Sequence, residues 1–241
     1  MRAIIIDDER LARTELRKLL QDYPEVEVVD EAANADEGIT KIDTLQPDLV
    51  FLDIQMPGKT GFDMLAELER APHVIFTTAY DEYALKAFDV NALDYLLKPI
   101  EPKRLADAVH KLQYEISKER QGLHGVNRGP LTEADQVFVK DGERCWFVKL
   151  SEIRLFESVG NYAKVFFGTN KPLILKSLNA LEERLDDRIF FRANRKHIIN
   201  LRWIEKIEPY FNGGLLVELK GGEKIEVSRR QTVKFKEMMS F

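Results

Sequence analysis

The sequence contains a single cysteine, Cys145, among 241 residues. One cysteine cannot form an internal disulfide or a cysteine-based zinc cluster, so nothing here requires an oxidising compartment. The sequence also lacks any run of about 18 apolar residues, which excludes a transmembrane helix. Its start, MRAIIIDDER, has too few apolar residues for the core of a signal peptide. We therefore expect a cytoplasmic chain with no membrane partner.

Glycine and proline are too scattered, at 13 and 9 residues, for a collagen-like or disordered chain, and 44% of the residues are hydrophobic. This composition is typical of a globular protein of one large or two compact domains. The net charge of −5 is the sum of two halves with charges of opposite sign. Residues 1–120 carry 15 Lys and Arg against 25 Asp and Glu, whereas residues 121–241 carry 21 against 16. An acidic half and a basic half indicate two domains with different tasks.

The first half alternates short β-branched apolar runs with amphipathic stretches, which is the pattern of an α/β protein. Five strands are predicted, at Ala3–Ile6, Val26–Asp30, Leu49–Leu52, Val74–Thr77 and Tyr95–Leu97. Helices are predicted after each of them, at Leu11–Leu20, Ala35–Leu45, Gly61–Glu69, Tyr83–Phe88 and Pro102–Glu119. Five strand-then-helix units predict a doubly wound, five-stranded parallel sheet, in which ligands bind at the carboxyl ends of the strands.

Between Lys118 and Asp135 the sequence has three glycines, a proline and almost no apolar periodicity. We therefore predict a linker over residues 119–134, which separates a domain over residues 2–118 from one over residues 135–241. The second domain is predicted to be mostly β, because short apolar runs alternate with turn signals such as Asp141-Gly142 and Gly221-Gly222. Only Leu178–Leu185 and Arg230–Met239 have helical patterns there. Nine strands are predicted, at Gln136–Lys140, Cys145–Leu150, Ile153–Ser158, Ala163–Phe167, Leu173–Leu175, Ile198–Asn200, Ile204–Tyr210, Leu215–Lys220 and Lys224–Val227.

Three carboxylates are expected to converge at one edge of the predicted sheet. Asp7 and Asp8 directly follow the first strand, and Asp53 follows the third. Like charges at close range repel each other unless a cation neutralises them, which favours a hard divalent ion with oxygen ligands. Mg²⁺ suits this partial cage, because it binds a few carboxylates together with water and phosphate oxygens. The pattern therefore predicts a magnesium site suited to phosphoryl chemistry on an aspartate.

Two further strands end in groups that suit the same chemistry. Thr78 can donate a hydrogen bond to a phosphoryl oxygen, and Lys98, which precedes Pro99, can supply a positive charge. An acid pair, an acid, a hydroxyl and a lysine thus each end a different strand.

The motifs IIIDDE, LDIQMPGKTG, TTAY and DYLLKP resemble the receiver domain of bacterial two-component response regulators over about residues 2–120. The resemblance implies that Asp53 accepts the phosphoryl group, that Thr78 and Lys98 contact it, and that Tyr95 is the switch aromatic. It also implies Mg²⁺ ligands at Asp7, Asp8, Asp53 and the backbone carbonyl of Gln55. A mixed apolar and charged dimer face is expected at Ala84, Lys86, Ala87, Phe88, Asp89, Leu93 and Asp94, although the apolar members of this set also fit a simple core.

The second half concentrates basic and amide side chains in three segments: ESVGNYAKVFF, FFRANRKHIIN and VSRRQTVKFK. Their order resembles the LytTR-type DNA-binding domain of the LytR/AlgR response regulators over about residues 132–240, an elongated β-fold that inserts loops into the major groove. The resemblance implies base contacts by Arg195 and Arg229, and phosphate contacts by Lys164, Lys176, Lys196 and Arg230. The remaining expected DNA-binding residues are Asn161, Tyr162, Asn194 and His197. Many family members have His-Arg-Ser where this chain has Asn194-Arg195-Lys196, which leaves the preferred base sequence open.

The leading hypothesis is a transcription factor rather than an enzyme, with at most weak self-dephosphorylation. A sensor histidine kinase phosphorylates Asp53, the chain forms a homodimer, and two basic domains bind paired half-sites in promoter DNA. An aspartyl-phosphate phosphatase would use similar groups, but that class begins with Asp-x-Asp, whereas here an acid pair comes first. A receiver coupled to a protein-binding or RNA-binding β-domain remains the alternative.

Overall fold

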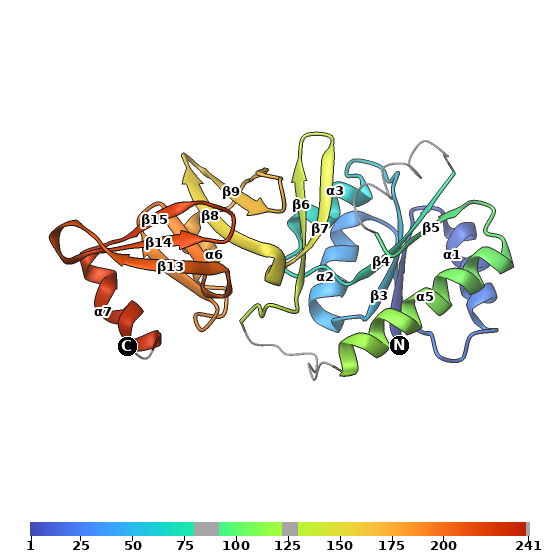
Figure 1. The fold of residues 1–241 in the computed structure, drawn as a ribbon. Coiled ribbons are helices and arrows are strands. Elements are labelled where there is room, and N and C mark those ends of the chain that lie inside the picture. The colour runs from blue at the N-terminus through green and yellow to red at the C-terminus, as the bar shows by residue number, and fades with distance from the viewer. Residues whose placement is uncertain (80–91, 122–129, 240–241) are drawn as a thin grey trace. The chain divides into compact units, whose positions relative to one another are not determined.

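The structure is a computed structural model that describes residues 1–79, 92–121 and 130–239 (Figure 1). The chain divides into two compact units. The first comprises Met1–Val126 together with Gln136–Phe147, and the second comprises Asn127–Asp135 together with Val148–Phe241. The helix predicted at Tyr83–Phe88, and Ala84, Lys86, Ala87, Phe88 and Asp89 of the predicted dimer face, lie outside the described residues.

The first unit contains a five-stranded parallel sheet of order β2-β1-β3-β4-β5, which confirms the predicted fold class. Its strands are β1 (Arg2–Ile6), β2 (Glu27–Ala32), β3 (Leu49–Asp53), β4 (His73–Thr78) and β5 (Asp94–Leu97). All five residues of β3 are buried, because helices cover both faces of the sheet. Since β1 and β3 are neighbours in this order, the residues at their carboxyl ends are brought side by side.

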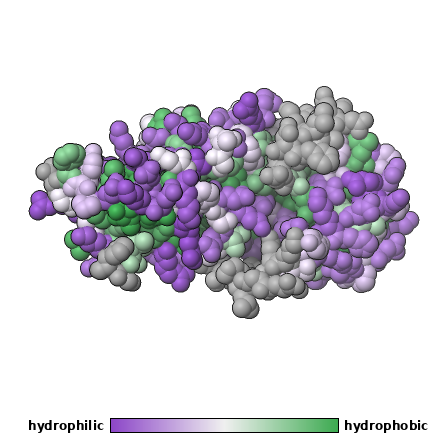
Figure 2. All heavy atoms as spheres, viewed as in Figure 1, coloured by the Kyte–Doolittle hydropathy of each residue, from purple (hydrophilic) through white to green (hydrophobic). Residues whose placement is uncertain are grey.

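Alternate residues along the strands divide the core of this unit into two layers. Ala3, Ile5 and Phe51 pack against α1 (Arg10–Leu20) and α5 (Pro102–Gln121) on one face. Ile4 and Leu52 pack against α2 (Ala35–Leu45) and α3 (Gly61–Glu67) on the other. In the view of Figure 2, hydrophilic residues make up most of the visible surface of the first unit. Among the described residues, no helix combines the length and the apolar character needed to cross a membrane.

A hairpin from beyond the predicted linker packs on the α3 side of the first unit. It consists of β6 (Gln136–Asp141) and β7 (Arg144–Lys149). Phe138 stacks on Phe62 with ring centroids 6.3 Å apart, and Phe62 contacts Phe76 at 4.9 Å. Lys140 pairs with Asp63 at the start of α3, and Ala71 N donates to Gln136 O at 2.9 Å. By its contacts, this hairpin therefore belongs to the first unit.

The second unit is mostly β, as the sequence predicts. A five-stranded sheet has the order β10-β9-β8-β12-β11, and a three-stranded sheet has the order β13-β14-β15. The strands of the larger sheet are β8 (Ile153–Val159), β9 (Tyr162–Phe167), β10 (Leu173–Ile174), β11 (Phe190–Asn194) and β12 (His197–Asn200). The smaller sheet contains β13 (Ile204–Pro209), β14 (Leu215–Leu219) and β15 (Lys224–Val227), and the helices are α6 (Leu178–Glu182) and α7 (Arg229–Met238).

Strand β11 is absent from the sequence-based prediction, and its burial explains why. Phe190 packs on Phe156, whereas the adjacent Phe191 packs on Phe235 of α7. Because neighbouring residues are buried on both faces of the strand, the alternation of apolar and polar residues that marks a half-exposed strand is missing.

Candidate functional site

Three carboxylates meet at the carboxyl edge of the parallel sheet. One ligand oxygen from each of Asp7, Asp8 and Asp53 lies within 4.8 Å of the others. Asp7 and Asp53 are buried, at 3% and 5% exposure, whereas Asp8 is exposed. This cluster, called the acid pocket below, thus combines two buried acids with one exposed acid, and its all-oxygen donor set fits a hard cation such as Mg²⁺.

Lys98 enters the pocket from the end of β5 and bridges its two buried acids. Its Nζ lies 2.9 Å from Asp53 Oδ2 and 2.7 Å from Asp7 Oδ2. The exposed Glu9 lies farther away, with Oε2 at 4.0 Å from Nζ. The Lys98–Pro99 peptide bond is cis. One ammonium group therefore contacts both buried carboxylates and offsets one of their two negative charges, which leaves the cluster able to take up a further cation.

Burial and hydrogen bonds together set the pKa values of Asp53 and Lys98. Burial raises the pKa of Asp53, and the hydrogen bond from Lys98 only partly opposes this shift. Burial acts to lower the pKa of Lys98, but its hydrogen bonds with Asp7 and Asp53 outweigh that effect, so its pKa lies above the usual value. Lys98 is therefore cationic at neutral pH and remains available to neutralise an anionic group on Asp53.

The loop after Asp53 is shaped so that α3 can begin against the acid. Gln55 N donates to Asp53 Oδ1 at 3.2 Å. A Cβ atom on Gly61 would lie 2.5 Å from the backbone oxygen of Asp53, so only glycine allows this close approach. Thr60 and Asp63 form a capping box that starts the helix.

Thr78 and Tyr95 lie on the two neighbouring strands β4 and β5. Thr78 is completely buried at the end of β4, and its backbone oxygen accepts from Lys98 N at 2.8 Å. Tyr95 is partly buried against the apolar layer on the α3 side of the sheet. The structure therefore places Thr78 at the carboxyl end of β4, as the sequence predicted, and Tyr95 within β5, three residues before Lys98. The acid pair, Asp53, Thr78 and Lys98 lie at the ends of four different strands, β1, β3, β4 and β5.

In the second unit, several expected DNA-binding residues form a row across the larger sheet. Lys164 of β9 lies opposite Glu157 of β8, which lies opposite His197 of β12, which in turn lies opposite Asn194 of β11. Residues that pair in this way share one face of a sheet. Lys164 Nζ is 3.5 Å from Glu157 Oε2, and burial lowers the pKa of His197 despite the opposing effect of Glu157.

The basic turn between β11 and β12 is held by its own side chains. Arg192 Nε donates to Asn194 O at 2.8 Å, and its Nη2 donates to Arg195 O at 3.0 Å. Arg192 also pairs with Glu182 of α6 at 3.2 Å. With these contacts, Arg192 shapes the turn, while the side chains of Arg195 and Lys196 are exposed at its tip.

The other residues expected to contact DNA lie at a neighbouring turn, after a short strand and at the start of a helix. Asn161 and Tyr162 are exposed at the β8–β9 turn, and Arg229 and Arg230 are exposed at the start of α7. Lys176 follows β10, which pairs with β9 through Leu173 and Lys164. Ser228 N donates to Ala193 O at 3.0 Å, which brings the start of α7 beside the basic turn.

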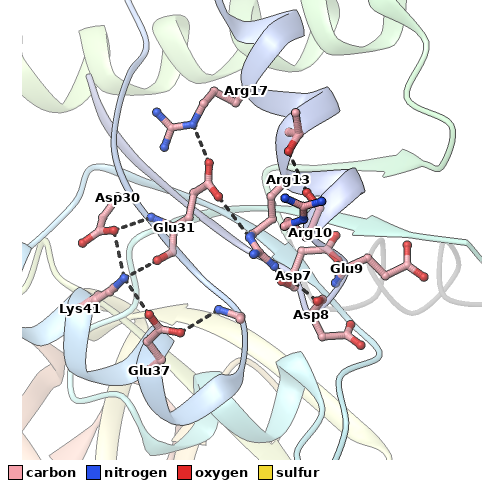
Figure 3. A network of polar contacts seen from close by, with 12 residues as sticks. Asp7, Asp8, Glu9, Arg10, Arg13, Arg17, Asp30, Glu31, Glu37 and Lys41 are labelled. Atoms are coloured by element: carbon pink, nitrogen blue, oxygen red, sulfur yellow. Dashed lines mark hydrogen bonds and ion pairs between the residues drawn. The ribbon is translucent and has the colours of Figure 1, made fainter.

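The sequence did not reveal the roles of three residues at these two sites. Glu157 is an acid within the basic row, Arg192 holds the basic turn, and Arg13 of α1 contacts the backbone of the acid pair (Figure 3). A charge count cannot distinguish an arginine that binds a backbone carbonyl from one that faces solvent. The pairing becomes visible only once the strands and helices are placed.

Comparisons with known proteins agree with both halves of this description. A family model for the response regulator receiver domain matches residues 3–110, and one for the LytTr DNA-binding domain matches residues 143–240. The chain is 36% identical to the sensory transduction protein LytT of Enterococcus faecalis, over 99% of each chain. It is also 36% identical to the transcriptional regulatory protein BtsR of Salmonella typhimurium, over 98% of each chain.

Among solved structures, the response regulatory domain of mrkE from Klebsiella pneumoniae is 30% identical, with a TM-score of 0.45, and covers 49% of this chain and 99% of its own. A LytTr DNA-binding domain from Bacillus cereus is 24% identical, with a TM-score of 0.42, over 44% of this chain and 97% of its own. This chain belongs to the two-component response regulators that join a receiver domain to a LytTR DNA-binding domain, and it is a regulator of transcription.

Proposed function

We propose that phosphorylation of Asp53 by a sensor histidine kinase controls sequence-specific binding of promoter DNA by the second unit. The observation that carries the proposal is the bridge from Lys98 to Asp53 and Asp7 in the acid pocket, where the third carboxylate, Asp8, is exposed. A buried carboxylate with a neighbouring cation and a cluster of oxygen ligands is the arrangement that phosphoryl transfer to an aspartate requires.

In this proposal, Asp53 Oδ attacks the phosphorus of a phosphohistidine, and the histidine nitrogen leaves with the electrons of the broken P–N bond. Asp7, Asp8, Asp53 and the backbone carbonyl of Gln55 would hold Mg²⁺, which supplies charge neutralisation for the phosphoryl oxygens. Lys98 moves from the Asp53 carboxylate to a phosphoryl oxygen. Hydrolysis of the product is at most a slow self-reaction, so the phosphorylated form persists as a signal.

Thr78 and Tyr95 are the proposed switch. The Thr78 hydroxyl donates to a new phosphoryl oxygen, and the Tyr95 ring moves into the space that this shift opens. Leu93 and Asp94 precede Tyr95 in the chain and belong to the proposed dimer face. Shifting the receiver from a mostly inactive to a mostly active population requires about 5 kcal/mol of differential interaction between the phosphoryl group and the two conformations.

On the DNA side, Arg195 and Arg229 are the proposed base readers, because both are exposed and the turn and helix start that carry them are joined through Ala193 and Ser228. The proposed phosphate contacts are Lys164, Lys176, Lys196 and Arg230, with Asn161, Tyr162, Asn194 and His197 at the same interface. A homodimer would place two such units on half-sites about 20 base pairs apart, on one face of the duplex. Promoter binding makes the bacterial cytoplasm the expected location.

The test is selection of randomised duplex DNA by the full chain, with and without Mg²⁺ and a small-molecule phosphodonor. Wild type is compared with Asp53→Asn, which keeps the size of the side chain but cannot accept the group. We expect an enriched two-box motif whose binding tightens with phosphodonor only in wild type. Equal tightening in Asp53→Asn would contradict the switch, and no enrichment in either protein would contradict sequence-specific DNA binding.

A further inference from the structure

Arg13 contacts the loop that carries the acid pair from the side of α1. Its Nη1 donates to the backbone oxygen of Asp7 at 2.6 Å and lies 3.4 Å from that of Asp8. The Arg13 side chain is only 13% exposed, so these contacts form in a partly dry environment. Figure 3 shows the guanidinium beside the loop that begins at Asp7.

The carboxylate of Glu31, in β2, also contacts the guanidinium of Arg13. Arg13 Nε lies 3.1 Å from Glu31 Oε2, and Arg17 Nε lies 2.5 Å from Glu31 Oε1, as drawn in Figure 3. Burial acts to raise the pKa of Glu31, but the hydrogen bonds from Arg17 and Arg13 outweigh it and leave the pKa below the usual value. Glu31 is therefore ionised at neutral pH and fixes the position of Arg13.

The backbone of Asp7 is restrained from both ends. Asp7 N donates to Ala32 O at 3.1 Å, the Asp7 oxygen accepts from Arg13, and Asp7 Oδ1 accepts from Glu9 N at 2.9 Å. Asp8 is the exposed acid of the cluster, and Arg13 extends the restraint to its carbonyl. Since two adjacent carboxylates repel each other, holding them at one edge of a pocket requires a backbone that does not relax away.

We propose that Arg13 is a positioning residue for the divalent cation: held by Glu31, it fixes the backbone of Asp7 and Asp8 so that both carboxylates face the pocket. The proposal rests on the proposed function, because it concerns the Mg²⁺ that phosphorylation would use. Arg13 acts through geometry, since it reaches the acid loop through the backbone oxygens of Asp7 and Asp8 and pairs with Glu31 and not with a carboxylate of the cluster. Outer partners that orient metal ligands have measurable effects on metal affinity even though they never touch the ion.

The structure provides a matched control. Arg17 carries the same charge on the same helix and pairs with the same Glu31, one turn farther from the acid loop. Arg17→Gln therefore removes one cation next to Glu31 and leaves the Arg13 contacts with Asp7 and Asp8 in place. Arg13→Gln removes the cation and those contacts together. Arg13→Lys keeps the charge but loses the planar fork that reaches Glu31 and the carbonyls at once.

The experiment is calorimetric titration of the full chain with MgCl₂ alone, without a phosphodonor, for wild type, Arg13→Gln, Arg13→Lys and Arg17→Gln. We expect Arg13→Gln to weaken Mg²⁺ binding about tenfold, Arg13→Lys several-fold, and Arg17→Gln less than about twofold. The Mg²⁺ concentration for half-maximal phosphorylation should rise in parallel, while the rate at saturating Mg²⁺ stays near that of wild type. Circular dichroism confirms that each variant is folded, and Arg13→Lys carries the test if Arg13→Gln does not fold.

Equal weakening in Arg13→Gln and Arg17→Gln would show that lost charge is responsible and would overturn the proposal. Unchanged Mg²⁺ affinity in both Arg13 variants would overturn it as well. Failure of the proposed function gives a different result, because wild type itself would then show no Mg²⁺ binding that depends on Asp53, and no phosphorylation at any Mg²⁺ concentration.

Discussion

The side-chain amide of Asn194 donates to the backbone oxygen of Glu226 at 2.7 Å, which joins the basic turn after β11 to the end of β15. The other end of the same amide, Oδ1, accepts from Lys196 N at 2.8 Å. Asn194 therefore uses both ends of its side chain to hold the turn. In this arrangement it holds the backbone of the turn that carries Arg195 and Lys196.

We predict that Asn194→Ala weakens DNA binding about tenfold for every sequence tested, because losing these hydrogen bonds costs about 1–2 kcal/mol and loosens the turn. Arg195→Ala should instead reduce the preference among sequences, since a bidentate base contact contributes about 1–3 kcal/mol of discrimination. Fluorescence anisotropy with the selected site and with single-base variants of it measures both effects. A loss of preference at one base in Asn194→Ala would contradict the positioning role and favour direct reading by the amide.

Removing Lys98 should destabilise the first unit, because Asp7 and Asp53 would remain buried without a counter-charge. We expect Lys98→Met to lower the free energy of unfolding by about 2–3 kcal/mol, somewhat less than breaking a fully buried pair. Mg²⁺ should recover most of the loss, because the cation replaces the ammonium group. Thermal unfolding with and without MgCl₂ measures this.

Lys59 provides the matched control for that experiment. It forms ion pairs with Asp36 and Glu67, whose side chains are 81% and 52% exposed. Because solvent screens such exposed pairs, Lys59→Met should change the stability much less than Lys98→Met does, and Mg²⁺ should not reverse the change. An equal loss in both variants would mean that the acid pocket is better hydrated than its burial indicates.

His197 should make the stability of the second unit depend on pH. Its pKa in the folded chain lies below the usual value, because burial and Lys196 outweigh Glu157. Below about pH 6.5 the unfolded chain takes up a proton that the folded chain refuses, so this contribution is fully present above that pH and is lost as pH falls. We expect wild type to lose up to about 1 kcal/mol more than His197→Gln between pH 7 and pH 5.5.

Urea unfolding monitored by Trp203 fluorescence tests this prediction, in a background where Trp146 is replaced by Phe so that only the second unit reports. The difference between wild type and His197→Gln cancels the titration of all other groups. Parallel stability curves for the two proteins would show that His197 is protonated equally in the folded and unfolded chains.

The hairpin contact with α3 should stabilise the first unit. Phe138→Ala removes a ring that packs on Phe62 and Phe147, and a buried Phe→Ala change costs about 3–5 kcal/mol. Hydrogen exchange of the full chain should show faster exchange in α3, within Gly61–Glu67. Phe211→Ala is the control, because Phe211 is 76% exposed and its removal should cost less than about 0.5 kcal/mol. Unchanged exchange in α3 would mean that the hairpin contributes nothing to its stability.

The pocket could be predicted from the sequence because its residues follow recognisable apolar strands. Asp7, Asp53, Thr78 and Lys98 each end a strand, and parallel strands bring their carboxyl ends to one edge, so order along the chain becomes proximity in space. Arg13 and Glu31 could not be predicted in the same way. Their pairing depends on how α1 lies across β1 and β2, which is a matter of tertiary packing.

The same contrast between local sequence pattern and tertiary packing determines what could be predicted for the second unit. Its mostly β character follows from short apolar runs and glycine turns, and most of its strands were predicted within one or two residues. The role of Arg192 could not be predicted, because the sequence shows a cluster of cations and does not reveal that this one is engaged by the carbonyls of Asn194 and Arg195. Strand β11 was hidden for the related reason that its two adjacent phenylalanines are buried on opposite faces.

The hairpin of β6 and β7 also determines where this chain can be recombined with its relatives. A chimera cut in the glycine-containing segment at residues 119–134 would join the receiver of one protein to the hairpin of another. Phe62 and Asp63 would then contact hairpin residues of a different protein. After the hairpin, the chain passes from the first compact unit to the second within β7, between Phe147 and Val148. Receivers exchanged together with their own hairpin should therefore transplant more readily than receivers cut at the linker.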